Sequence, residues 1–63
     1  MNRIREIRES INMAQKELAE LVGISCPFLC DLEKNRRGAK PETYQRIAEA
    51  LNVSVSELMK KAG

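Results

Sequence analysis

The chain has 63 residues, enough for one domain with a modest core, since a chain of this size buries only about 60% of the surface that it exposes when unfolded. Eleven Lys and Arg residues oppose nine Asp and Glu residues, and there is no His. The lack of a histidine base and of a Gly-rich phosphate loop argues against an enzyme. No apolar run is long enough for a membrane-spanning helix or a signal peptide, so a cytoplasmic protein with no membrane partner is expected.

Isoleucines at helical spacing open the chain. Ile4, Ile7 and Ile11 predict a first helix that begins near Asn2 and ends near Asn12, with its other face charged. Asn12 is then the candidate cap of the next helix, because the residue directly before that helix is an alanine, which has no side-chain acceptor.

Residues 15–34 have the pattern of two helices joined by a sharp turn. Gly23 directly follows the last apolar residue of the first helix and takes a positive φ without steric cost, so the chain is predicted to turn there. Ala19, one turn earlier, lets the two helices cross closely. The stripes that would face a common core are Leu18, Leu21 and Val22 in the first helix and Leu29 and Leu32, with Phe28 at the edge, in the second.

The second of these helices has its own start signals. Ser25 is placed as its N-cap, with a hydroxyl available to the free amides of the first turn. Pro27 is tolerated in that turn, because the amide that it lacks would have no intrahelical partner. Ile24 closes the turn from the core side. These signals predict a helix from about Cys26 to Lys34.

The last third of the chain predicts two more helices. Gly38 and Pro41 mark a loop, with Pro41 at the first position of a fourth helix that Asn52 ends. Ser54 and Glu57 form a capping box that opens a short fifth helix. The inward side chains are expected to be Tyr44, Ile47, Ala48 and Leu51 in the fourth helix and Val55, Leu58 and Met59 in the fifth. The fold class is therefore all-α, with five short helices.

A set of residues spread over nearly the whole chain is typical of one family. The set comprises Gln15, Leu18, Ala19, Gly23, Ile24, Ser25, Leu29, Leu32 and Glu33, then the Pro41 loop and the closing sequence ALNVSVSEL. With it the chain resembles the Cro/CI-type helix-turn-helix domains (the XRE family), to which lambdoid phage repressors and many small bacterial regulators belong. The resemblance implies one lambda-repressor-like domain over residues 1–63, of bacterial, phage or mobile-element origin. It also implies a structural pair between Arg8 and Glu33.

Double-stranded DNA is the partner that the resemblance implies. The helix from about Cys26 to Lys34 would lie in the major groove of a sequence-specific transcriptional regulator, a repressor, with the preceding helix across the backbone. Independently, residues 34–40 hold four Lys and Arg residues and no acid, although a solvated surface loop would look the same. The expected phosphate contacts are Gln15, Lys16, Arg36, Arg37 and Lys40.

The base-facing side of the predicted recognition helix is unusual. A helical wheel points Cys26, Pro27, Cys30, Asp31 and Lys34 away from the core. Only Lys34 belongs to the usual base readers, which are Arg, Lys, Asn and Gln. Cys and Pro can touch a thymine methyl and Asp31 can accept from a cytosine amine, so readout by apolar contact or by DNA shape is expected.

Cys26 and Cys30 allow three interpretations. They fit small hydrophobic contact residues. A disulfide is disfavoured, because both Cβ bonds lean the same way along one helix. Two thiolates form only half of a tetrahedral zinc shell unless a second subunit supplies the rest, so no metal and no cofactor is expected. Oxidised or metallated thiols at the DNA surface would nevertheless block docking, which keeps a thiol- or metal-responsive regulator as an alternative.

A protein-interaction module is the competing functional class. An antitoxin-like or recruitment domain would use the same helical surface, and the Cys, Pro and Phe side chains of the recognition helix favour it. A regulator that binds a palindromic operator would need a weak homodimer, for which the expected contact is the Leu58 and Met59 region together with the loop before Pro41. The same two side chains would also suit the core.

Overall fold

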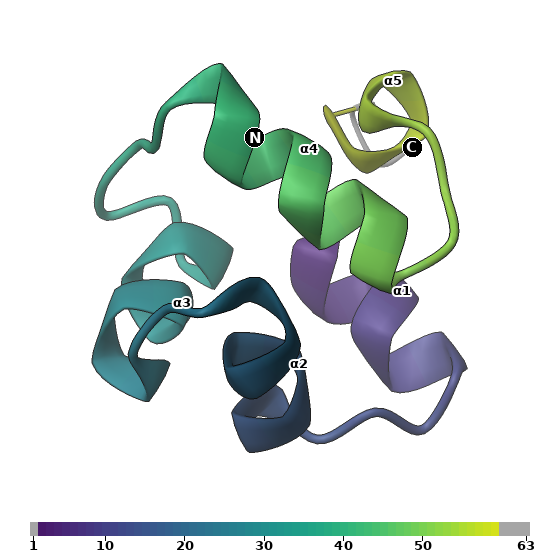
Figure 1. Ribbon diagram of the computed structural model, residues 1–63, viewed down its shortest axis with the longest axis horizontal. Coiled ribbons are helices and arrows are strands. Elements are labelled where there is room, and N and C mark those ends of the chain that lie inside the picture. The colour runs from purple at the N-terminus through teal and green to yellow at the C-terminus, as the bar shows by residue number, and fades with distance from the viewer. Residues whose placement is uncertain (1, 60–63) are drawn as a thin grey trace.

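The computed structural model describes residues 2–59, and within that range the chain forms five helices and no strand. The helices are α1 (Ile4–Ser10), α2 (Gln15–Val22), α3 (Cys26–Glu33), α4 (Pro41–Ala50) and α5 (Val55–Met59). α2 packs against α3 and α4, and α4 packs against α5, so α4 runs through the middle of the molecule in Figure 1. The predicted all-α fold is confirmed. Within residues 2–59, no helix is long and apolar enough to span a lipid bilayer.

Apolar side chains from all five helices form one core. Six of them are completely buried and come from every helix, so each helix is anchored by at least one: Ile4, Leu18, Leu29, Leu32, Ile47 and Leu58. Ala19, in α2, is buried as well, with 2% of its surface exposed. Ile24 and Tyr44 are half-buried against this core.

Two apolar side chains of the first two helical segments do not join the core as predicted. Leu21 is 64% exposed, because α2 turns Leu18, Ala19 and Val22 inward and Leu21 then lies about 100° around the helix from the centre of that stripe. Ile11 is also largely exposed, because α1 ends one residue earlier, at Ser10, and the helical phase no longer applies.

Four helices end in the same way. A residue with positive φ follows each of α1 to α4: Asn12 (57°), Gly23 (83°), Asn35 (59°) and Asn52 (60°). At each end the next amide donates to a carbonyl five residues back, as Met13 N does to Arg8 O at 3.0 Å, which is the bond of a Schellman motif. The predicted ends at Gly23 and Asn52 are confirmed. Asn12 was expected to cap α2, and this is wrong, because it closes α1 instead.

The helix starts follow the sequence signals closely. Ser25 Oγ accepts from Phe28 N–H at 3.2 Å, so the predicted N-cap of α3 is confirmed. α2 has no capping hydroxyl, and the Glu17 carboxylate accepts from the N–H of its N-cap residue, Ala14, at 3.1 Å. Pro41 occupies the first turn of α4 as predicted.

The capping box of α5 is only half formed. Ser54 Oγ accepts from Glu57 N–H at 3.1 Å. The Glu57 carboxylate does not turn back to Ser54 and instead accepts from Arg3 Nη1 at 2.9 Å. Arg3 N–H also donates to Leu58 O at 2.8 Å, so the start of the described chain is fastened to α5 by two bonds. A cation within reach is a stronger partner for a carboxylate than a neutral amide.

Leu58 was expected in a homodimer contact, and the structure corrects this. Its side chain is 0% exposed and belongs to the core, so it offers no surface to a second chain. Val55 and Met59 lie at the surface of α5, each more than a third exposed. Both were expected to face the core, and this is wrong. α5 has only five residues, and of its three apolar side chains only Leu58 reaches the core.

Candidate nucleic-acid interface

A buried ion pair joins α1 to the end of α3. Arg8 Nε lies 2.9 Å from Glu33 Oε2, and Arg8 Nη2 donates to Glu33 Oε1 at 3.2 Å, which is a bidentate arrangement. The two side chains are only 10% and 3% exposed. Arg8 Nη1 also donates to Met13 O at 2.8 Å, so the guanidinium bonds at all three nitrogens. The predicted pairing of Arg8 with Glu33 is present, and it fixes the orientation of α3.

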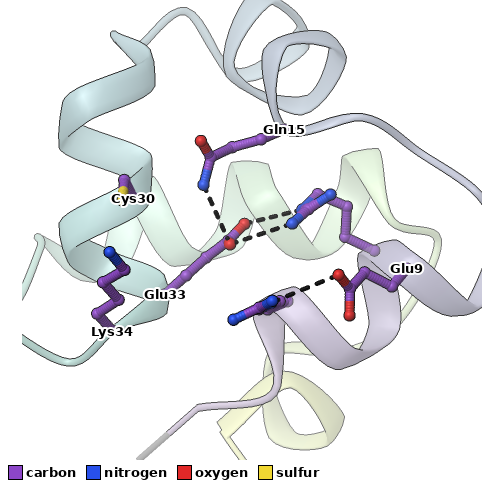
Figure 2. Close-up of a pocket in the computed structure, with 7 residues that line it drawn as sticks. Glu9, Gln15, Cys30, Glu33 and Lys34 are labelled. Atoms are coloured by element: carbon purple, nitrogen blue, oxygen red, sulfur yellow. Dashed lines mark hydrogen bonds and ion pairs between the residues drawn. The ribbon is translucent and has the colours of Figure 1, made fainter.

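Gln15 is the third member of this network. Its Nε2 donates to Glu33 Oε1 at 3.2 Å, from the first residue of α2 (Figure 2). The amide therefore has one N–H engaged with Glu33 and a second N–H to offer. Gln15 is half-buried, and its neighbour Lys16 is exposed. The first amides of a helix have no intrahelical acceptors, so this end of α2 holds several donors for an anion.

The predicted base-facing residues differ in how far they reach the surface. Pro27 and Lys34 are exposed, whereas Cys26, Cys30 and Asp31 are half-buried. Cys26 packs against the core, so less of it faces outward than the helical wheel implies. Cys30 and Lys34 line one open pocket with Gln15, and Figure 2 shows them one turn apart on α3. Of the predicted base-facing residues, Pro27 and Lys34 are therefore the most accessible to a partner.

The loop after α3 presents its cations to solvent. Arg36, Arg37 and Lys40 are all exposed. The Arg37 guanidinium carbon lies 4.3 Å from the centre of the Phe28 ring, a cation–π contact that holds this loop against α3. Phe28, Arg37 and Lys40 also line a second open groove, beside Ile24.

Asn2 fastens the other side of this region. Its Nδ2 donates to Leu32 O at 2.9 Å and to Asn35 Oδ1 at 3.3 Å, and its Oδ1 accepts from Ile4 N–H at 3.2 Å. Sequence reasoning missed this contact and the stacking of Arg37 on Phe28. Neither has a periodic signal, because each joins a residue outside a helix to a partner that is distant in the sequence.

Known proteins share this arrangement of helices. A model of the helix-turn-helix family matches residues 4–58. The chain belongs to this family, of the Cro/CI (XRE) type. It is 36% identical over 61 residues to the HTH-type transcriptional repressor RghR of Bacillus subtilis, an alignment that covers 95% of this chain and 45% of RghR.

Other relatives are similar in kind. The HTH-type transcriptional regulator DdrOP3 of Deinococcus deserti is 35% identical over 57 residues, which cover 90% of this chain and 44% of that protein. This chain thus spans less than half the length of these curated relatives. The crystal structure of SinR, the master regulator for biofilm formation, in complex with DNA matches with a TM-score of 0.84 and 27% identity, over 92% of this chain and 94% of SinR.

Proposed function

We propose that this chain, as one domain over residues 1–63, is the DNA-binding part of a transcriptional repressor that places α3 in the major groove. The observation that supports this proposal is the distribution of ion pairs within the domain. The arginines outside the loop after α3, which are Arg3, Arg5, Arg8 and Arg46, each pair with a carboxylate. Within residues 2–59, none of the four cations at positions 34–40 has such a partner.

Unpaired cations gathered beside one exposed helix need anions from outside the domain. Lys34, Arg36, Arg37 and Lys40 would contact phosphates on one side of the groove, with Lys34 also within reach of base edges. Gln15 and Lys16 would contact phosphate at the start of α2, where the helix dipole adds to the attraction. The structure of SinR, which aligns with nearly all of this chain, was solved in complex with DNA, and this supports DNA as the partner.

Base readout would come from a small set of groups. Pro27 and Cys30 would touch thymine methyl groups, and Asp31 would accept from a cytosine amine. Lys34, the C-cap residue of this helix, is its one conventional hydrogen-bond donor to guanine. Cys26 would contribute least, because it packs against the core. We therefore expect moderate sequence selectivity, with DNA shape contributing at positions that no side chain contacts.

A weak homodimer on DNA is part of the proposal. With Leu58 in the core, the remaining contact on α5 is the exposed pair Val55 and Met59, one helical turn apart. We further propose a cytoplasmic setting in a bacterium or phage, in line with the relatives above. The curated relatives above are named as a transcriptional regulator and a transcriptional repressor, which agrees with a role other than catalysis.

Selection from a randomised DNA duplex library tests the function. The expected result is a two-fold-symmetric motif with half-sites about one helical turn apart. The salt dependence of binding then identifies the phosphate contacts. Replacing Arg36 and Lys40 with Gln should lower the slope of log K against log salt by about 0.9 for each lost contact.

Arg46→Gln is the matched control for each single loop replacement, since it also removes one positive charge, here from α4, where Arg46 is exposed and paired with Glu42 at 3.1 Å. It should leave the slope unchanged. Equal effects of the loop and control variants would show only a net-charge effect. No retention of DNA by the wild-type chain would reject the proposal and favour a protein partner on the same surface.

A further inference from the structure

Cys26 and Cys30 form a pair that DNA binding alone does not explain. Both are free thiols on α3, one helical turn apart, and both are half-buried, so each partly reaches the surface. Side chains four residues apart on a helix lie on the same side, with Cβ atoms about 5–6 Å from each other. The two sulfur atoms can therefore be directed at a common point beside α3.

The spacing fits a bridging atom better than a direct bond. A disulfide needs Cβ atoms about 3.8 Å apart, less than the spacing along one turn of helix. A metal ion between the sulfurs adds two metal–sulfur bonds, each about 2.3 Å long in zinc sites, and so spans the larger gap. The same spacing that disfavours oxidation to a disulfide thus favours a two-thiolate metal complex.

The surroundings restrict which ion would bind. No group of three or more metal-binding side chains occurs in residues 2–59, and the whole sequence has no His. Zinc, which takes four ligands in structural sites, would be left with an incomplete shell. Thiolates select soft ions such as Cu(I), which accepts two ligands. The pair therefore suits a soft cation of low coordination number.

The pocket that Cys30 lines also holds charged side chains. It contains two ion pairs, Arg8 with Glu33 and Arg5 with Glu9. Lys34 has no ion-pair partner among the described residues, and in Figure 2 its side chain extends along α3 in the direction of Cys30. The form of cysteine that binds a metal is the thiolate, and metal binding displaces its proton.

We propose that Cys26 and Cys30 bind one Cu(I) ion per chain and that this binding releases the protein from DNA. Two S–H bonds break, two Cu–S bonds form, and two protons pass to solvent, with no change of oxidation state. The protein gains one positive charge and loses two protons, so this side of α3 becomes more negative by one unit. The release from DNA rests on the proposed function, whereas the metal site does not.

Titration of the whole chain with Cu(I) tests the site without DNA. Under anaerobic conditions, with ascorbate as reductant and a chromophoric Cu(I) chelator as competitor, the wild-type chain should withdraw one Cu(I) per chain. Cys26→Ser and Cys30→Ser should each lower the affinity by more than the roughly 10–100-fold that removal of an outer-shell contact costs. One Cu(I) per two chains, or single variants that bind as well as the wild type, would overturn the proposal.

A spacing control separates a built site from two reactive thiols. The double variant Cys30→Ser with Asp31→Cys keeps two cysteines but places them five residues apart, about 140° around the helix. It should bind Cu(I) no better than Cys30→Ser alone. Affinity equal to that of the wild type would show that the pair on one side of α3 has no special role. Circular dichroism of each variant confirms that the helices are intact.

DNA retention completes the test. If the copper-free wild-type chain binds DNA, one equivalent of Cu(I) should weaken that binding at least tenfold. In the Cys30→Ser variant, Cu(I) should leave the DNA affinity at the value that the same variant has without copper. If the copper-loaded wild-type chain retains DNA as well as the copper-free chain does, the proposed release from DNA is rejected. The metal site itself is tested separately by the titration. No retention of the apo chain would count against the proposed function instead.

Discussion

Arg8→Met should cost the domain most of its stability. The substitution leaves the Glu33 carboxylate 3% exposed with only the Gln15 amide as partner. Removing one member of a buried ion pair costs about 3–5 kcal/mol, because the remaining charge stays buried without compensation. A domain of 63 residues has a total free energy of unfolding of about 3–9 kcal/mol. We therefore expect the Arg8→Met variant to lose roughly half or more of its free energy of unfolding.

The double variant Arg8→Met with Glu33→Met should recover much of this loss. Replacing both members of a buried pair with apolar side chains of similar volume is often neutral or stabilising, because neither charge then has to leave water. Gln15 loses its acceptor but is only half-buried, so water can take that place. If the double variant recovers the free energy of unfolding, the Arg8–Glu33 pair serves mainly to orient α3 and adds little net stability.

Urea unfolding followed by circular dichroism measures both effects through the midpoint and the slope. Arg5→Met is the matched control on the same helix. Arg5 pairs with Glu9 at 3.4 Å with both side chains more than half exposed, so its loss should change the free energy of unfolding by no more than about 0.5 kcal/mol. A loss below about 1 kcal/mol in Arg8→Met, the range of an exposed pair, would refute the buried-charge reasoning.

Three further outcomes are expected. Gly23→Ala should lower the free energy of unfolding by about 1–2 kcal/mol through the positive φ alone, since an added Cβ meets no atom within 4 Å. Gly23→Asn should cost less, because Asn adopts positive φ more readily than Ala. Equal losses of the two variants in urea unfolding would contradict this. The hydrogen bond from Arg3 lowers the pKa of Glu6. The ionised Glu6 side chain therefore stabilises the fold above the ordinary Glu pKa, and this stabilisation is lost as the pH falls through the lowered pKa. The midpoint of thermal unfolding should accordingly vary less with acid pH in Glu6→Gln than in the wild type. Phe28→Leu should weaken DNA binding without changing its salt slope, because Arg37 keeps its charge but loses its stacking partner; a slope reduced by about 0.9 would instead mean that the phosphate contact is gone.

Local signals in the sequence were sufficient for most of the fold. Gly23, Ser25 and Pro41 act through their own backbone or side-chain chemistry, so their roles can be predicted without knowledge of the tertiary structure. The positive φ of Asn12 and Asn35 was not predicted, because Asn serves equally well as an N-cap and as a left-handed helix end. The choice depends on which neighbouring helix ends within reach, and that is a tertiary property.

The candidate site was less accessible to sequence reasoning than the fold. The unpaired state of the cations at positions 34–40 depends on where every carboxylate lies, and only the structure supplies this. The partial burial of Cys26 was missed for a related reason. A helical wheel gives an angle around one helix, whereas burial also depends on the neighbours that cover that angle.

α3 serves the core and the proposed DNA contact at the same time, and this limits what it can read. Leu29 and Leu32 are fully buried, and Glu33 is held in the ion pair with Arg8. Pro27 has no amide N–H, so Lys34 is the main donor left for bases on the outer side of this helix. Affinity must then come largely from phosphate contacts of the loop and of α2, which are sensitive to charge. One negative charge added beside Lys34 by a bound Cu(I) complex would weaken these phosphate contacts directly, which is why a small thiol site on α3 would be an effective control point.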